Sequence, residues 1–276
     1  GLKIMSSFND HLAFVMRTAD AALDKFGYEY LIIASGIEKL QFLDDMHYPF
    51  KPNPQFKYWA PLTRNPNSFI VYKSGQKPIM IYFQPDDYWH VPPSPPHGDW
   101  VEYFEIHIIN EVSDALKYLP QLSRAAIIGE ADAALGDCIP NNPKALLDYL
   151  HYHRAYKTPY ELQQMRKAQV KAVRGHQAAE QAFRHGGSEA QINAAFLSAS
   201  GHCDSDLPYN NIVALNENGA TLHYQYKSIH KPSHHRSLII DAGAEHNGYA
   251  ADITRTYGNG FELYEQLIDA VENEQL

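Results

Sequence analysis

The stretch from residue 238 to residue 256, LIIDAGAEHNGYAADITRT, places the strongest constraint on the fold of this chain. It begins with an apolar run typical of a buried strand, and it contains Asn247-Gly248, a dipeptide that favours a tight β-hairpin turn. The sequence therefore predicts an antiparallel hairpin centred between His246 and Asn247. A bulge at Asn247-Gly248 can perturb the turn and still keep this pairing of the strands.

Two carboxylates occupy matching places in this hairpin. With the expected centre, Asp241 stands opposite Asp252. Opposite residues of an antiparallel pair share one face of the sheet, with Cα atoms about 4.5–5.5 Å apart. Neighbouring carboxylates repel each other unless a cation lies between them or one of them holds a proton. The simplest solution is a divalent metal, or a pair of metals about 3.5–4 Å apart that activates water for hydrolysis.

Two other interpretations of the aspartates stay open on the residues alone. They could form an acid/base dyad that shares one proton, or Asp241 could end its strand while Asp252 faces solvent. The surroundings favour the metal. An unpaired Asp beside the buried run 238–240 would be costly, and Gly243 with four nearby alanines leaves room around the carboxylates.

The composition limits the class of protein. The 276 residues are 45% hydrophobic and 20% charged, which is typical of a globular protein with enough length for two domains. The net charge of −9 argues against nucleic acid or an anionic membrane as a partner, since both require a basic surface. No apolar run approaches the ~20 residues of a membrane span. The distant cysteines Cys138 and Cys203 form no disulfide framework and indicate a reducing compartment, the cytoplasm.

The first half of the chain predicts a mixed α/β domain. Apolar residues at helical spacing mark helices, and short β-rich runs mark strands. The expected helices are 11–26 and 143–152, and the expected strands are 30–34, 68–73, 78–83 and 124–129, with a hairpin turn at Ser74-Gly75. The proline-rich segments 44–61 and 91–96 are expected to be irregular. Because segment 44–61 is also aromatic, we expect it to pack on its own domain or on a partner subunit.

The second half opens with a strong helix start. Thr158 is a suitable N-cap, Pro159 suits the first helical position, and Glu161 can return a hydrogen bond to the cap. The helices expected here are 158–184, a second one that Ser188 and Gln191 begin and that ends near residue 201, and 261–276. Two hairpins lie between them, one pairing 212–216 with 221–226 and the other being the hairpin described above.

The order of Asp241, ten further residues and then Asp252-Ile-Thr-Arg-Thr resembles the first metal-ligand motif of the pita-bread metallopeptidases. From Met5 to Leu276 the chain resembles the bacterial Xaa-Pro dipeptidase (prolidase) branch of that family, which includes the organophosphorus acid anhydrolases. The similar segments are residues 41–45, 48–57, 88–90, 152–158, 208–217, 222–224 and 241–256. The longest of them are too specific for chance similarity.

The resemblance implies an α/β (α+β) protein of two domains. Residues 1–156 would form an N-terminal creatinase-like domain with a mixed sheet, and residues 157–276 the first portion of a pita-bread catalytic domain. Family members use a further His and two Glu as metal ligands, and a second active-site His, all later in the chain. We therefore expect a fragment that alone binds metal weakly and catalyses poorly. Met5 resembles a natural start that follows four added residues.

The resemblance also implies roles at the metal site. Asp241 would bind one of two divalent metal ions, usually manganese, and Asp252 would bridge both. Thr254, two residues beyond Asp252 on the same strand face, would orient a ligand or the bridging water. His223 resembles the active-site histidine that contacts the substrate. Without the family, a structural histidine is the simpler interpretation of His223.

Three further residues would contact the substrate. Tyr209 resembles part of the pocket wall, although a buried aromatic is the simpler interpretation without the family. Asp45 and Trp89 belong to segments that, in this branch, reach into the active site of the partner subunit, where Asp45 would receive the substrate's α-ammonium group. The resemblance thus implies a homodimer that hydrolyses Xaa-Pro dipeptides, with cleavage of phosphotriesters as a side reaction.

Three related kinds of protein fit the residues less well. A non-catalytic relative that binds peptides has no need of the two aspartates together with Thr254 and His223. Methionine aminopeptidase shares the aspartate pair and lacks the N-terminal domain. Creatinase-like enzymes have that domain and use no metal, so the aspartate pair argues against them.

Overall fold

The computed structural model describes residues 7–275, so the expectations for Met5 and Leu276 lie outside the described residues. The chain divides into two compact units, Gly1–Gln163 and Gln164–Leu276. Each unit has its own sheet and its own hydrophobic core. Within residues 7–275, every helix is too short or too polar to cross a lipid bilayer.

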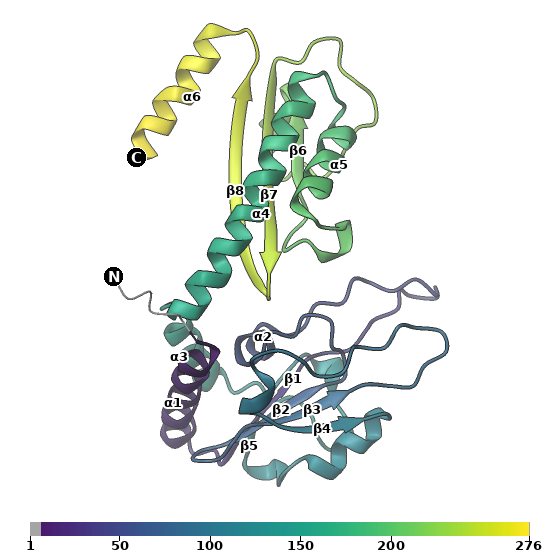
Figure 1. Cartoon of the computed structure of the whole chain (residues 1–276), viewed down its shortest axis with the longest axis vertical. Coiled ribbons are helices and arrows are strands. Elements are labelled where there is room, and N and C mark those ends of the chain that lie inside the picture. Colours follow the sequence, from purple (N-terminus) through teal and green to yellow (C-terminus); the bar gives the residue numbers. More distant parts are fainter. Residues whose placement is uncertain (1–6, 276) are drawn as a thin grey trace. The chain divides into compact units, whose positions relative to one another are not determined.

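The first unit is built around a five-stranded mixed sheet with the order β4-β3-β2-β1-β5 (Figure 1). Its strands are β1 (Tyr30–Ala34), β2 (Phe69–Lys73), β3 (Ile79–Phe83), β4 (Glu105–Ile109) and β5 (Ala125–Ile128). Strand β2 runs antiparallel to β1 and β3, whereas β5 and β4 run parallel to β1 and β3 respectively. The predicted mixed sheet and its β2–β3 hairpin are confirmed. The sequence prediction lacks β4, because Glu105 and His107 interrupt its apolar run.

Both faces of this sheet are buried. The helices α1 (Phe8–Phe26), α2 (Pro54–Trp59) and α3 (Lys144–Arg154) pack on one face. Leu31 and Ile33 of β1 point into that core, whereas Ile32 and Ala34 enter a second core on the opposite face. Alternate side chains of a strand point to opposite faces, so a strand buried on both sides is continuously apolar. The 3₁₀ turns of this unit are Val101–Tyr103, Val112–Tyr118, Leu122–Arg124 and Ala131–Ala133.

Helix α2 corrects the prediction that segment 44–61 is irregular throughout. The side chain of Asn53 accepts a hydrogen bond from the backbone N–H of Gln55, and Pro54 occupies the first turn. A proline in the first turn costs no hydrogen bond, since that N–H has no partner inside the helix. The proline-rich sequence therefore begins a short helix here instead of preventing one.

A buried histidine joins three parts of the first unit. The ring Nε2 of His11 lies 2.8 Å from the carbonyl oxygen of Tyr58, which can only accept, so Nε2 carries the proton. The hydroxyl of Thr158 accepts from the backbone N–H of Glu161 and lies 2.9 Å from Nδ1 of His11, to which it donates. Since the carboxylate of Glu161 accepts from the backbone N–H of Thr158 at 2.8 Å, the predicted capping box is confirmed.

We expect acid to weaken the first unit through His11. Burial lowers the pKa of His11. The folded protein therefore keeps the ring neutral at pH values where the unfolded chain, with a histidine pKa near 6.5, already binds a proton. The free energy of unfolding has its full value above about pH 6.5. It falls as the pH drops towards the folded pKa, by at most about 1.4 kcal/mol per pH unit.

Tryptophan fluorescence can follow this loss, because Trp59, Trp89 and Trp100 all lie in the first unit. Urea unfolding of wild type should lose more stability between pH 7.5 and pH 5.5 than unfolding of a His11→Gln variant. An equal pH dependence in the two proteins would contradict the assignment.

The second unit contains a three-stranded antiparallel sheet with the order β6-β7-β8 (Figure 1). Its strands are β6 (Ile212–Leu215), β7 (Ser237–His246) and β8 (Tyr249–Gly258), and its helices are α4 (Pro159–Arg184), which starts in the first unit, α5 (Glu189–Ser200) and α6 (Glu262–Gln275). Helices α4 and α5 pack against the even-numbered residues of β7 from Leu238 to Ala244. The odd-numbered side chains of β7, Asp241 among them, therefore point away from these helices.

The second unit confirms the helices and the second capping box. Ser188 and Gln191 exchange hydrogen bonds at the start of α5, and Gly201 ends the helix in the left-handed conformation with φ of 71°. Glycine adopts this conformation without steric cost, which explains why α5 ends there. The predicted C-terminal helix is confirmed as α6 up to Gln275.

The predicted hairpin between 212–216 and 221–226 is wrong. Strand β6 is present, but the 3₁₀ turns Asp204–Asp206 and Asn216–Ala220 flank it, and residues 221–226 form no strand. The β-rich pattern of residues 221–226 is overridden by side-chain hydrogen bonds. Tyr224 donates its hydroxyl hydrogen to Glu189 at 2.8 Å, and Asn218 donates to the same carboxylate at 2.8 Å.

Candidate metal centre

The β7–β8 turn sets the register of the two aspartates. Asn247 and Gly248 have φ of 50° and 84° and form a two-residue turn between the paired His246 and Tyr249. Positive φ at both central residues is the pattern that Asn-Gly favours in hairpins. The turn centre therefore lies between Asn247 and Gly248, one residue later than predicted.

The prediction that Asp241 stands opposite Asp252 is therefore wrong. Asp241 pairs with Thr254, and Asp252 pairs with Gly243. Moving the turn centre by one residue shifts each pairing by two residues, and a shift of two leaves every side chain on its original face. Asp241 and Asp252 are thus diagonal neighbours on the same face of the sheet, with Thr254 beside Asp241.

The side chain of Tyr209 connects the two carboxylates. Its hydroxyl oxygen lies 2.8 Å from Oδ1 of Asp241 and 2.8 Å from Oδ1 of Asp252. The two Oδ1 atoms are therefore separated by no more than twice that distance. Gly243 provides the space for the Tyr209 ring, since a Cβ atom at residue 243 would lie 2.6 Å from Cε1 of Tyr209 and 2.1 Å from the carbonyl oxygen of Ala251.

The electrostatics of this cluster favour a bound cation. The hydroxyl of Tyr209 carries one proton, so it can donate to only one of the two carboxylates at a time. Burial, followed by the hydrogen bonds to Asp252 and Asp241, raises the pKa of Tyr209 well above its usual range, so the phenol stays neutral. Two acidic groups thus share one donor proton. Hard oxygen ligands with excess negative charge suit a divalent ion such as Mn²⁺ or Mg²⁺, so the residues present fit a metal.

The described residues do not by themselves assemble a metal site. Among residues 7–275, no three side chains of His, Cys, Asp or Glu converge closely enough to hold a metal ion. Asp241 is half-buried in the central strand, whereas Asp252 and Thr254 are exposed on β8. The two aspartates alone therefore do not complete such a site.

His223 is not in contact with this cluster through hydrogen bonds. It lies in the irregular segment after the 3₁₀ turn Asn216–Ala220 and is exposed. Within the described part of the chain, its ring has no hydrogen-bond partner. The next residue, Tyr224, donates a hydrogen bond to Glu189, so the chain beside His223 is held in place.

His176 lies next to the aspartate cluster, and the sequence did not lead us to predict it. It lies on α4, and its Nε2 donates to the carbonyl oxygen of Ala242, the residue after Asp241, at 2.9 Å. Burial lowers the pKa of His176, so this ring stays neutral, and its Nδ1 has no partner within residues 7–275. The pairing of β6 with β7 ends at Asp241, so His176 supports β7 where β6 no longer does. Its position within the helix stripe Ala168, Ala172 and Ala179 is the signal that could have identified it.

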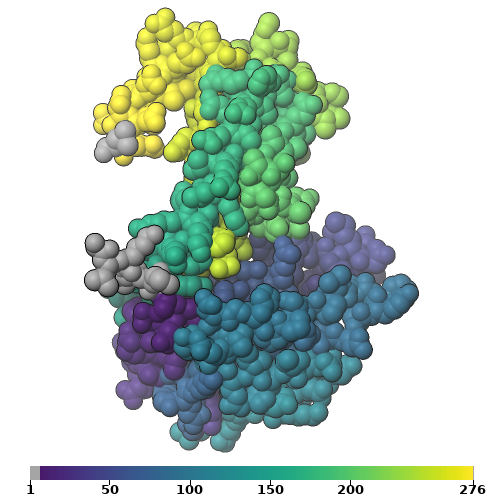
Figure 2. All heavy atoms as spheres, in the orientation of Figure 1, coloured from purple at the N-terminus to yellow at the C-terminus, as the bar shows by residue number. Residues whose placement is uncertain are grey.

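Asp45 and Trp89 lie in the first unit, on two exposed loops. The loops touch each other, since the rings of His47 and His90 are 6.2 Å apart between centroids. Figure 2 shows these loops, in purple and blue, projecting from the surface of the first unit. The aspartate pair belongs to the second unit, so the structure does not bring Asp45 or Trp89 together with it within one compact unit.

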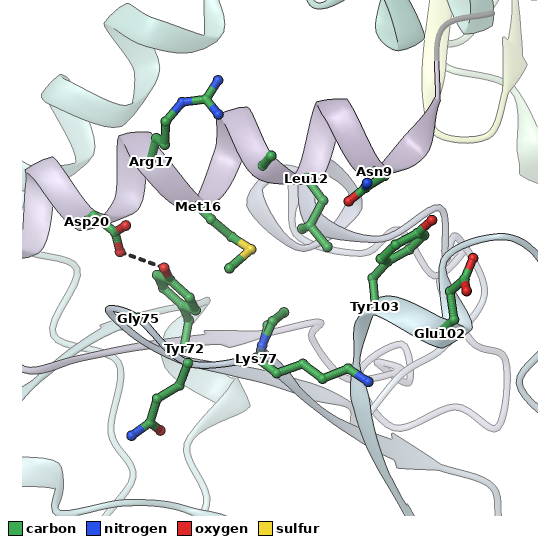
Figure 3. A pocket seen from close by; sticks show the side chains of 13 residues that line it. Asn9, Leu12, Met16, Arg17, Asp20, Tyr72, Gly75, Lys77, Glu102 and Tyr103 are labelled. Atoms are coloured by element: carbon green, nitrogen blue, oxygen red, sulfur yellow. Dashed lines mark hydrogen bonds between the residues drawn. The ribbon is translucent and has the colours of Figure 1, made fainter.

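Cavities of the first unit are lined by other side chains. One of about 600 Å³ lies between α1 and the β2–β3 turn, where Leu12 and Met16 point towards Tyr72 and Lys77 (Figure 3). Tyr72 donates its hydroxyl hydrogen to Asp20 at 2.5 Å, so the carboxylate there is already paired. Cavity size is a poor guide to the site in this chain, because the aspartates lie on an open face of a sheet.

Comparison with known families agrees with the geometry. Residues 6–152 match the family described as Xaa-Pro dipeptidase, N-terminal domain. The chain belongs to the Xaa-Pro dipeptidase family. Residues 163–276 match metallopeptidase family M24, so the aspartate pair lies inside the segment that this match covers.

Curated relatives extend this result over almost the whole chain. A Xaa-Pro dipeptidase of Xanthomonas campestris pv. campestris (strain B100) is 53% identical over 271 residues, which cover 98% of this chain and 62% of the relative. One of Stenotrophomonas maltophilia (strain K279a) is 50% identical over 270 residues, covering 97% of this chain and 61% of the relative. The chain thus spans about three-fifths of the length of these relatives.

Solved structures establish the fold. A variant of Escherichia coli aminopeptidase P superimposes with a TM-score of 0.64 at 21% identity, covering 95% of this chain and 67% of the other. Zinc-substituted Escherichia coli aminopeptidase P in complex with product gives a TM-score of 0.63 at 19% identity, covering 90% of this chain and 62% of the other. The predicted pita-bread architecture, preceded by a mixed-sheet domain, is confirmed.

Proposed function

We propose that this chain belongs to a dinuclear-metal dipeptidase that hydrolyses Xaa-Pro dipeptides. The observation that carries the proposal is the cluster of Asp241, Asp252 and Tyr209, in a chain about 50% identical to proteins named Xaa-Pro dipeptidase. In this proposal residues 1–156 form the creatinase-like domain, and residues 157–276 contribute the first part of the catalytic domain.

The proposed metal site uses the residues of the β7–β8 hairpin. Asp241 would hold one ion and Asp252 would bridge two, with Mn²⁺ as the preferred metal. When bound, these ions supply Lewis acidity for hydrolysis. Thr254, paired with Asp241 across the strands, would orient its carboxylate. The remaining ligands, a His and two Glu, would come from residues outside this sequence.

The proposed substrate contacts use the other residues singled out from the sequence. His223 would contact the dipeptide at the reacting carbonyl, and the ring of Tyr209 would form a wall of the pocket. Asp45 and Trp89 would come from the partner subunit, with Asp45 accepting hydrogen bonds from the α-ammonium group of the dipeptide. An open metal site of this kind would also cleave phosphotriesters as a side reaction.

A dipeptidase assay tests the proposed function. The full-length natural protein, supplied with Mn²⁺, should cleave Leu-Pro and leave Pro-Leu, which lacks an Xaa-Pro bond, intact. Chelation should abolish the activity, and added Mn²⁺ should restore it. A folded protein that binds Mn²⁺ and leaves Leu-Pro intact would overturn the proposal.

We also propose a homodimer, formed through the two loops of the first unit. Phe42 and Leu43 are each 90% exposed, Trp89 is 83% exposed and Val91 is 97% exposed. Several large apolar side chains exposed on neighbouring loops are typical of interaction sites. A second copy is the partner that the proposed function requires, because Asp45 and Trp89 act there across subunits. The free cysteines Cys138 and Cys203 support the cytoplasm as its location.

The oligomeric state should depend on these aromatic residues. In the full-length protein, a double variant with Phe42→Ser and Trp89→Ser should change from dimer to monomer in sedimentation analysis, because it removes one exposed aromatic anchor from each loop. A Tyr152→Ser variant, which changes an exposed aromatic of α3, should remain a dimer. A dimer that persists in the double variant would place the interface elsewhere.

A further inference from the structure

One buried carboxylate fastens the whole segment that carries His223. Glu189 is the first residue of α5, and only 1% of its surface is exposed. Its two carboxylate oxygens accept four hydrogen bonds. The donors are the backbone N–H of Leu215 at 3.0 Å, the side-chain amide of Asn218 at 2.8 Å, the hydroxyl of Tyr224 at 2.8 Å and the backbone N–H of Ser228 at 2.9 Å.

These donors span the segment from end to end. Leu215 is the last residue of β6, Ser228 lies thirteen residues later, and Tyr224 directly follows His223. The backbone adds one bond to the same place, from the N–H of Ala190 to the carbonyl oxygen of Ser228 at 3.1 Å. Residues 221–228 have no strand pairing to hold them. The hydrogen bonds to the Glu189 carboxylate therefore hold this segment in the absence of strand pairing.

The loss of these hydrogen bonds would be costly in free energy. A buried carboxylate must be matched by donors, and here each oxygen has two. Hydrogen bonds to a charged group are stronger than neutral ones, and a group that loses its partner inside the protein is strongly unfavourable. The Glu189 carboxylate thus holds both ends of segment 215–228, and Asn216 anchors the near end further through its bonds with His234 and Arg236. His223 has no hydrogen bond of its own within the described residues, so its place depends on the conformation of that segment.

We propose that Glu189 is a positioning residue for His223, which it keeps at a fixed location by fastening residues 215–228. The proposal rests on the proposed function, in which His223 contacts the substrate. Glu189 itself is assigned no contact with substrate or metal. It acts only through the segment and therefore through His223.

A glutamine at residue 189 separates this role from simple packing. Glu189→Gln keeps the volume and one carbonyl oxygen, which can still accept from Leu215 and Asn218. Its NH₂ group replaces the oxygen that accepts from Tyr224 and Ser228, and it meets the N–H of Ser228 donor to donor. The far end of the segment loses its bonds to the side chain and keeps only the backbone bond from Ala190 to Ser228, while the near end stays bonded. Tyr224→Phe is a milder variant, which removes the hydroxyl that donates to Glu189 and accepts from Asn218 and leaves the carboxylate in place.

Amide hydrogen exchange of the full-length protein tests the fastening without any need for activity. In E189Q the amides of residues 221–228 should exchange about tenfold faster or more, while those of β7 and β8 stay unchanged. E217Q is the matched control, because Glu217 lies in the same segment and pairs with Arg236 on the surface. Its exchange should match wild type. Unchanged exchange in both E189Q and Y224F would overturn the proposal, as would acceleration across the whole second unit.

A double-mutant cycle tests the connection to His223. E189Q should lower kcat/KM for Leu-Pro about tenfold through kcat, with little change in KM, and in the H223A background it should cause less than about a twofold further loss. Equal losses in both backgrounds would overturn the positioning role, because packing damage does not depend on His223. An inactive wild type would overturn the proposed function instead, and the exchange result would still decide whether Glu189 fastens the segment.

Discussion

An Asp252→Asn substitution is expected to lower kcat/KM for Leu-Pro by at least about 1,000-fold in the full-length protein and to abolish tight Mn²⁺ binding. Asparagine keeps the shape of the side chain and an oxygen that can accept from Tyr209. It removes the negative charge that a bridging ligand contributes. Isothermal titration with Mn²⁺ and steady-state kinetics measure the two effects.

The same substitution should not weaken the metal-free fold. Asp241 and Asp252 share one donor hydrogen from Tyr209, so removing one charge relieves repulsion between them. The free energy of unfolding of the metal-free protein should stay equal or rise by up to about 1 kcal/mol. Asp148→Asn, which removes an exposed charge on α3, is the control and should leave activity unchanged. Retained activity in Asp252→Asn, or a large loss of stability in its metal-free form, would contradict the proposed metal site.

A Gly243→Ala substitution is expected to destabilise the second unit by about 3 kcal/mol and to abolish activity. The new Cβ atom would lie 2.1 Å from the carbonyl oxygen of Ala251, which belongs to the paired strand, and 2.6 Å from Cε1 of Tyr209. Neither the strand nor the ring can stay in place. Tyr209 would move away from Asp241 and Asp252, so the effect reaches the carboxylates as well as the sheet.

Amide exchange in β7 and β8 gives the size of this effect. Gly260→Ala is the matched control, because residue 260 has φ of 79° and open space around its Cβ position. It should cost only about 1 kcal/mol, through backbone strain alone. Tryptophan fluorescence of this chain should show unchanged unfolding of the first unit in both variants. If Gly243→Ala costs no more than Gly260→Ala, the close packing of Tyr209 against residue 243 is refuted.

The sequence predicts the carboxylate face correctly and the pairing of the carboxylates incorrectly, for one physical reason. Strand side chains alternate with period two, so the separation of Asp241 and Asp252 puts them on one face whether the turn is centred before or after Asn247. The pairing partner depends on which residues occupy the turn. In the structure the two turn residues are Asn247 and Gly248. The predicted centre would instead put His246 and Asn247 in the turn and Gly248 in the strand.

Sequence patterns correctly predicted the features that depend on contacts between neighbouring residues. The caps at Thr158 and Ser188 and the end of α5 at Gly201 depend on neighbouring residues, so spacing was enough to find them. Segment 221–226 was predicted as a strand because its residues favour strands. Its conformation is instead fixed by Glu189, at least 32 positions earlier in the sequence, and no local pattern contains that contact.

The same distinction between local and long-range contacts applies to the residues around the candidate site. Tyr209 was expected in the pocket wall from the family resemblance, but its hydrogen bonds to both carboxylates can be found only in the folded structure. His176 lies 66 residues from Ala242, whose carbonyl it contacts, and its sequence neighbours look like an ordinary helix face. Such contacts join distant parts of the chain, so single-sequence reasoning finds their residue types and misses their partners.

Anomalous X-ray diffraction from crystals of the Mn²⁺-loaded, full-length protein tests the proposed metal centre most directly. We expect two manganese peaks about 3.5–4 Å apart, with a carboxylate oxygen of Asp241 on one and the carboxylate of Asp252 bridging both. An active, manganese-loaded enzyme with no peak in contact with Asp241 or Asp252 would contradict it.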